Sequence, residues 1–312
     1  DRRIIVEKPD LKGREDILRV HIKHVKTEPD INLHEMALAT SGAAGADLAN
    51  MVNEAALREE RCNRKTVSQE DLMEAVEVII AGKEKKDRIL SEKEKRIVSF
   101  HEVGHALATA VQKHTQPVHK ITIVPRTMGS LGYTMQMPEE EERYLMSKDE
   151  IVDQITVFLA GRAAEELVFN VQTTGASNDI EKATKTARAM VTKYGMTKEL
   201  GCVCYGTDNN SVFLGRDMGS RTQDYSEATA AKIDQLVLDM VNKAYGDATK
   251  ILSDNMDKLH DIAKYLIKHE KMGSEDFTAV MNGTYKEPEE VEQETADKEP
   301  SAETKVDEST EG

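Results

Sequence analysis

Apolar residues recur every three or four positions along most of this 312-residue chain, a spacing that places them on one face of a helix. Four such stretches fill the first 81 residues, and each is bounded by polar or turn-forming residues. The pattern predicts helices over residues 11–24, 32–40, 46–61 and 68–80. Ser68 is expected to cap the last of them, and the strongly charged segment 82–91 that follows is expected to be a linker.

The rest of the chain up to residue 284 is also mainly helical in pattern. Helices are expected over residues 92–113, 148–169 and 179–194, and two more long helical patterns occupy residues 225–269. Two short runs typical of strands, residues 120–124 and 131–137, are separated by Pro125 and Gly129. The sequence therefore predicts a mostly α fold with a small β element.

His101, Glu102 and His105 give the most specific chemical signal in the chain. Histidines four residues apart lie on one helical face, close enough for two imidazoles to bind one ion. The spacing suits a catalytic zinc, which lowers the pKa of a bound water to about 7 so that it can attack a peptide carbonyl. Glu102 projects near the metal and is expected to act as the general base.

The helix that carries this motif is well marked. Ser91 and Glu94 have the spacing of a capping box just before it. Its inward face is expected to comprise Ile97, His101, Gly104, His105, Ala108 and Val111. A lone inward histidine is usually an ordinary hydrogen-bonded core residue, whereas two histidines around a glutamate are difficult to place in a core without a metal.

A catalytic zinc usually has three protein ligands and one open position, so a third ligand is required. Ala108 and Val111 stand where the metzincin motif needs glycine and histidine, which excludes that class. His114 and His119 are disfavoured because they are too near in sequence and too close to the end of the helix to fold back easily.

Two carboxylate options remain for the third ligand. Glu165 and Glu166 lie near the end of an apolar helix, and Asp179 lies at the head of the next one. Asp179 would suit the dipole of its helix without any metal. It also shares a face with Ala183, Ala187 and Met190, which would aim it toward the core, where a carboxylate needs a partner. Spacing alone leaves both options open.

Composition narrows the class of protein. Hydrophobic residues make up 39% and charged residues 32%, as in a soluble helical protein. No apolar run approaches the roughly 18 residues of a membrane span, and no signal peptide opens the chain. Cys62, Cys202 and Cys204 are expected to be free thiols. The net charge of −15 argues against nucleic acid as the main partner.

The negative charge is concentrated at the C-terminal end. Residues 286–312 contain eleven acids against three lysines, more than half of the net charge, together with Pro288 and Pro300. Residues 285–312 are therefore expected to form a disordered acidic tail.

Several motifs together resemble the FtsH family of ATP-dependent zinc metalloproteases. They are residues 101–105, 164–166, 174–179 and 212–216, which agree with the family in order and spacing. Residues 1–3, 9–14 and 45–48 resemble the end of that family's AAA ATPase module. The resemblance covers about residues 1–284, and a first residue Asp1 within a strand-like run indicates a piece of a longer protein.

The resemblance implies roles for particular residues. Asp179 would be the third zinc ligand beside His101 and His105. Glu165 or Glu166 would orient one of these ligands without contacting the zinc itself.

The resemblance also implies a division of the chain. Residues 1–81 would be the helical lid of an AAA module, residues 82–91 a linker and residues 92–284 an α-helical zincin-like peptidase domain. ATP and Mg²⁺ would act only in the full-length protein, because this sequence contains no G-x-x-x-x-G-K-[ST] phosphate loop.

The implied protein is an endopeptidase that degrades membrane and short-lived soluble proteins. It would be a homohexamer that threads unfolded substrate from an ATPase ring into a closed chamber. An N-terminal anchor, absent from this soluble piece, would hold it in a bacterial inner membrane with the catalytic part facing the cytoplasm. Substrate is expected to lie extended along an edge strand such as residues 131–137.

Two other functions compete with this reading. One is a structural zinc module that only holds a ring together, which would need four protein ligands and no open position. The other is an unrelated single-chain peptidase that uses Glu165 or Glu166 as a zinc ligand. The AAA-like first 80 residues argue against the second.

Overall fold

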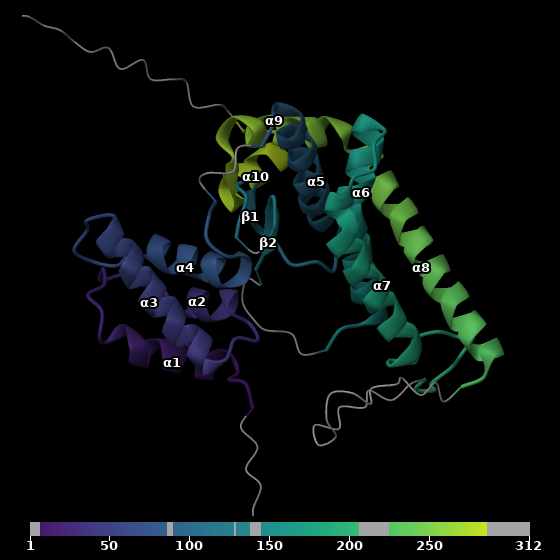
Figure 1. The fold of residues 1–312 in the computed structure, drawn as a ribbon, viewed down its shortest axis with the longest axis horizontal. Coiled ribbons are helices and arrows are strands. Elements are labelled where there is room, and N and C mark those ends of the chain that lie inside the picture. The colour runs from purple at the N-terminus through teal and green to yellow at the C-terminus, as the bar shows by residue number, and fades with distance from the viewer. Residues whose placement is uncertain (1–6, 86–89, 128, 138–144, 206–224, 286–312) are drawn as a thin grey trace, which may run out of the picture.

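Four helices pack together at the N-terminal end of the computed structural model, which describes residues 7–85, 90–127, 129–137, 145–205 and 225–285 (Figure 1). They are α1 (Leu11–Ile22), α2 (Leu33–Ala39), α3 (Gly45–Arg61) and α4 (Gln69–Ala81). Their shared core contains side chains that are almost fully buried, namely Leu18, Met36, Leu48, Met51 and Leu72. We call these four helices the lid.

Local polar side chains set where these helices begin. The Asp10 carboxylate accepts a hydrogen bond from the Gly13 amide at 2.7 Å, at the start of α1. Ser68 and Asp71 form a reciprocal capping box at the start of α4, which confirms Ser68 as its N-cap.

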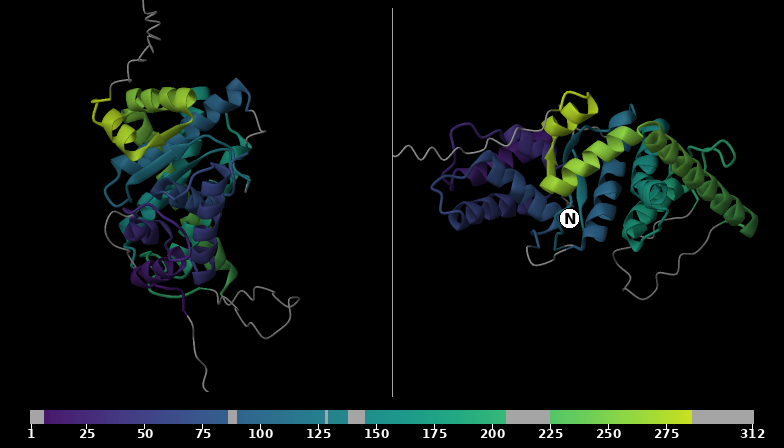
Figure 2. Two further views of the ribbon diagram at one scale, coloured as in Figure 1. Left: turned by 90° about the vertical axis from the view of Figure 1, so that its left-hand side faces the viewer. Right: turned by 90° about the horizontal axis from the view of Figure 1, so that it is seen from above.

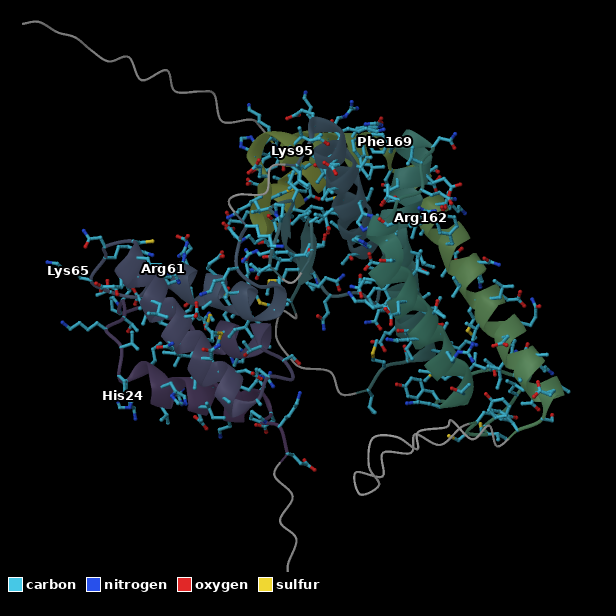
Figure 3. All side chains as sticks on the ribbon, in the orientation of Figure 1. His24, Arg61, Lys65, Lys95, Arg162 and Phe169 are labelled. Atoms are coloured by element: carbon cyan, nitrogen blue, oxygen red, sulfur yellow. The ribbon has the colours of Figure 1, made fainter. Side chains whose placement is uncertain are left out.

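The second part of the molecule contains the six helices that follow the lid in the chain. They are α5 (Glu92–Val111), α6 (Lys148–Phe169), α7 (Ser177–Thr192), α8 (Glu227–Asp254), α9 (Met256–His269) and α10 (Ser274–Met281). α5 packs against α6 and α9, and α6 packs against α7 and α8. Figure 3 marks this pairing with Lys95 on α5, and Arg162 and Phe169 on α6.

A three-stranded antiparallel sheet covers one side of α5. Its order is β2 (Tyr133–Gln136), β1 (Val118–Thr122), β3 (Lys271–Gly273), so β2 is an edge strand among the strands that the structure describes. Thr134 pairs with Ile121, and Tyr133 pairs with Thr122. Figures 1 and 2 show the sheet where the lid meets the second part.

The predicted elements are largely confirmed, and α6 has the expected bounds. β1 lies two residues earlier than expected, because pairing with both neighbours ends at Thr122. The prediction that Val111 faces inward is wrong, because Val111 is the last residue of α5 and is 40% exposed. β3 and α10 were not anticipated. Residues 212–216 of the resemblance and the expected tail from residue 286 onward lie outside the described residues.

In the part of the chain that the structure describes, no helix has both the length and the apolar character needed to cross a membrane. All three cysteines are free, as expected, and all three are exposed.

Candidate metal centre

The centre is built where α5 and α6 come unusually close. Gly104 on α5 allows this, because a Cβ there would lie 2.6 Å from the Ala160 carbonyl oxygen and 2.9 Å from the Ala164 Cβ. Gly161 on α6 faces the two histidines, and a Cβ there would lie 2.5 Å from His105 Nε2 and 2.7 Å from His101 Nε2. The two glycines therefore let the helices approach each other closely and let the α6 backbone lie directly against the imidazole rings.

Both imidazoles are oriented by acceptors on α6. His101 Nδ1 lies 2.8 Å from Glu165 Oε1, and His105 Nδ1 lies 2.7 Å from the Val157 carbonyl oxygen. A carbonyl and a carboxylate only accept, so each Nδ1 is the donor. Each Nε2 is thereby turned toward the other, at a separation of 3.1 Å. Such fixing of the ring and its tautomer is typical of metal-binding histidines.

Asp179 completes the group from α7. A short 3₁₀ turn, Thr174–Ala176, precedes this helix. The face of α7 that carries Asp179 also carries Ala183, Ala187 and Met190, which are fully buried. The carboxylate accordingly points inward. Its Oδ2 lies 3.4 Å from His101 Nε2 and 3.6 Å from His105 Nε2.

These three atoms have the spacing that zinc requires. Bonds of about 2.0–2.1 Å at tetrahedral angles separate neighbouring ligand atoms by about 3.3 Å. The observed separations are 3.1, 3.4 and 3.6 Å. Within the described residues, this is the one group of three or more histidine, cysteine or acidic side chains that could hold a metal ion. The residues present therefore fit a zinc ion held by three protein ligands, and the described residues supply no fourth ligand to this group.

The charges around the site favour a cation. Burial lowers the pKa of His101, but hydrogen bonds with Asp179 and Glu165 outweigh it and raise that pKa to about 10. For Asp179 the effects are reversed: burial raises its pKa, but hydrogen bonds with His101 and His105 hold that pKa well below its usual range. The site stabilises positive charge between the histidines, which is where a metal ion would place its own.

Glu102 lies beside this group without belonging to it. It is 7% exposed and comes from the turn of α5 between the two histidines. Burial raises the pKa of its carboxyl, against the opposing effect of His101 and His105. β2 lies against it on the other side, with Thr134 Oγ1 3.2 Å from Glu102 Oε2.

The structure separates the two neighbouring glutamates. Glu165 is 2% exposed, contacts the far nitrogen of His101 and accepts the Thr173 amide at 3.0 Å. Burial alone would raise its pKa, but the hydrogen bond with His101 lowers it. Glu166 instead accepts the Tyr245 hydroxyl, away from the histidines.

One disfavoured histidine lies apart from the centre, and three unpredicted contacts surround that centre. His114 pairs with Asp153 at 2.9 Å and does not join the group. Gly161, the Val157 carbonyl and Thr134 were not singled out. A glycine in the middle of a long apolar helix was the available signal for Gly161, because it costs helix stability unless something packs against it.

Comparison with known proteins agrees with a zinc site in a peptidase. The family model for peptidase family M41 matches residues 88–280, and that for an AAA+ lid domain matches residues 30–74. The chain is 55% identical to the ATP-dependent zinc metalloprotease FtsH of Clostridium perfringens, over 94% of this chain and 40% of that protein. It is 53% identical to the FtsH of Lancefieldella parvula, over 90% of this chain and 43% of that protein.

These matches confirm the resemblance to the FtsH family and the mostly helical fold class, an AAA lid followed by a helical peptidase domain. The chain spans less than half the length of these curated relatives.

Proposed function

Because the chain belongs to peptidase family M41, and is by that membership a zinc metalloendopeptidase, we propose that His101, His105 and Asp179 are its zinc ligands and Glu102 its general base. The observation that carries the proposal is the triangle of ligand atoms with sides of 3.1, 3.4 and 3.6 Å. It leaves a fourth position for water or substrate, as catalysis requires.

Zinc held there would polarise the scissile carbonyl and make an attacking water acidic enough to lose a proton near neutral pH. Glu102 takes that proton and returns it to the leaving nitrogen. Glu165 holds the His101 ring through Nδ1, which leaves Nε2 free to bind zinc, and the Val157 carbonyl does the same for His105.

The substrate is proposed to be an extended polypeptide paired along β2. An edge strand presents unpaired backbone groups to an incoming chain. Main-chain pairing of this kind gives binding with broad tolerance of side chains. β2 suits this role because it is at the edge of the sheet formed by the described strands and also contacts Glu102 through Thr134.

The whole protein is proposed to be a membrane-anchored, ATP-dependent protease assembled as a homohexamer. The AAA+ lid match and the relatives' printed name, ATP-dependent zinc metalloprotease, support the link to ATP and Mg²⁺. Its substrates would be unfolded or membrane proteins, and it would sit in a bacterial inner membrane facing the cytoplasm. We place the division at residues 1–81 for the lid, 82–91 for the linker and 92–284 for the peptidase.

Glu102→Gln tests the mechanism. Glutamine keeps the shape but cannot take the proton, so casein hydrolysis should fall by about 10²- to 10⁴-fold while zinc content stays at the wild-type level. Elemental analysis and hydrolysis would be measured on the same preparation. A variant that kept near-full activity would overturn the assignment of Glu102, and a zinc coordination shell of four protein ligands by X-ray absorption would indicate a structural site instead.

A further inference from the structure

Strand β2 is shared between the lid and the catalytic helix. Successive side chains of a strand point to opposite faces. Tyr133 and Met135 point to one face and pack into the core of the lid. Thr134 and Gln136 point to the other face and contact α5. Figure 1 shows β2 lying between α4 and α5.

On the α5 side, β2 closes around Glu102. Thr134 Oγ1 lies 3.0 Å from the Glu102 carbonyl oxygen and 3.2 Å from its carboxylate Oε2. Gly132 lies so close that a Cβ there would be 2.9 Å from Glu102 Cγ. Gln136 Nε2 donates to Thr109 Oγ1 at 2.8 Å, one turn beyond His105. The Glu102 carboxylate is therefore bounded by β2.

On the lid side, a buried ionic cluster holds the same strand. Glu77 of α4, which is 4% exposed, accepts hydrogen bonds from the Tyr133 hydroxyl and from Lys120. It also accepts Arg126 Nη2 at 2.5 Å. We call Glu74, Glu77, Lys120, Arg126 and Tyr133 the lid cluster.

Arg126 is the centre of the lid cluster and is fully buried. Its Nη1 donates to Glu74 Oε1 at 3.0 Å and to the Gly82 carbonyl oxygen at 3.1 Å. Its guanidinium lies 5.5 Å from the centre of the Tyr133 ring. A buried charge that loses a partner is strongly penalised, so this arrangement resists displacement of β2 relative to α4.

We propose that Thr134 is a positioning residue for Glu102, and that the lid keeps Thr134 in place through the contact between Tyr133 and Glu77. This inference rests on the proposed function, in which Glu102 handles the proton. Adjacent residues of one strand then have opposite tasks: Tyr133 anchors the strand to the lid, and Thr134 presents its hydroxyl to the base. The lid becomes part of the scaffold of the catalytic site.

The first test compares Thr134→Val with Thr134→Ser on an unstructured fluorogenic peptide. Removing a hydrogen bond to a charged group should lower kcat by about tenfold to a hundredfold. KM and zinc content should stay at wild-type values, because the backbone of β2 and the metal ligands are untouched. Serine restores the hydroxyl and should recover most of kcat. Thr122→Val is the matched control, since Thr122 is a fully buried threonine on β1 that makes no hydrogen bond to Glu102.

The second test is Tyr133→Phe, which removes one hydroxyl from the lid cluster. It should lower kcat by about two- to tenfold with KM and zinc content unchanged. Tyr265→Phe is the matched control, because it removes a tyrosine–carboxylate contact, to Asp276, elsewhere in the peptidase.

Wild-type kcat in Thr134→Val, with Glu102→Gln inactive, would overturn this inference and leave the proposed function intact. A loss in Thr134→Val that serine fails to recover would overturn it as well, since volume and not the hydroxyl would then matter. Thr134→Ala carries the same comparison if the valine variant does not fold. An active Glu102→Gln would instead remove the proposed function itself.

Discussion

At the scale of single residues, adjacent side chains in this protein have unlike roles that only orientation reveals. Glu165 and Glu166 are neighbours on α6, yet one supports His101 and the other accepts from Tyr245. Consecutive helical residues point about 100° apart. Glu165 therefore points toward the histidines, whereas Glu166 points away from them. The sequence could narrow the choice to this pair and no further.

Three substitutions should rank zinc affinity by distance from the ion. Asp179→Asn removes a proposed ligand charge, so zinc content and activity should both collapse. Glu165→Gln weakens the support of His101 and should cost about 10- to 100-fold in affinity. Glu166→Gln is the control and should bind zinc like the wild type. Zinc retained against a series of chelator concentrations measures the order. Zinc retention in Asp179→Asn with loss in Glu165→Gln would move the third ligand to Glu165.

At the scale of elements, the helices were predictable because their signals are local. Capping boxes at Ser91 and Ser147 mark where α5 and α6 begin, and both can be read within four residues. β3 was missed because it is three residues long and exists only through pairing with β1, which lies some 150 residues earlier. α10 was missed because it is eight residues long and has no side-chain cap to mark its start. The sequence could give the periodicity of α5 and α6 but not their close approach, which determines the shape of the site.

Gly161→Ala tests that close approach. Alanine is the better helix former, so α6 should stay helical, but its Cβ would lie 2.5 Å from His105 Nε2 and should block the metal. Zinc content and hydrolysis should fall together while far-UV circular dichroism is unchanged.

The control for Gly161 is Gly246→Ala within α8, where an added Cβ meets nothing within 4 Å. It should raise the free energy of unfolding by about 0.4–1 kcal/mol and leave zinc binding as it was. Equal zinc content in Gly161→Ala and wild type would show that the helices can separate to admit the methyl group.

At the scale of the whole molecule, the lid and the peptidase are not independent bodies. Met135 of β2 is buried within the lid core although the strand belongs to the peptidase sheet. The family matches divide the chain into two domains, but the packing crosses that division. The hydrophobic pattern could not predict this shared strand, because it shows that Met135 is buried but not which domain it packs against.

The stability of the lid should depend on pH through Asp71. Burial would raise the pKa of this fully buried carboxylate, but the Ser68 amide, Arg58 and Arg64 hold it below its usual range. A lowered folded-state pKa gives stability that is complete above the unfolded value of about 3.9 and is lost as pH falls through the folded value.

Asp71→Asn should therefore lower the free energy of unfolding by about 1–3 kcal/mol at pH 7 and flatten its decline below about pH 4. Urea unfolding followed by circular dichroism from pH 2 to 7 provides the measurement. Glu70→Gln, which removes a more exposed partner of Arg58, is the control and should change the slope little. An unchanged acid slope in Asp71→Asn would place the titrating group elsewhere.

The burial of Arg126 has a practical consequence for anyone recombining relatives of this protein. The charged segment 82–91 is the obvious crossover point for joining a lid from one relative to a peptidase domain from another. A crossover there would bring in a foreign α4, and a substitution at position 74 or 77 would remove one of the carboxylates that contact the buried Arg126 guanidinium. A junction placed before Gln69 transplants α4 together with the peptidase. Such a junction keeps Glu74 and Glu77 with Arg126 but separates Asp71 from Arg58 and Arg64. Chimeras joined at the linker should therefore fold best when the incoming lid also has glutamate at positions 74 and 77.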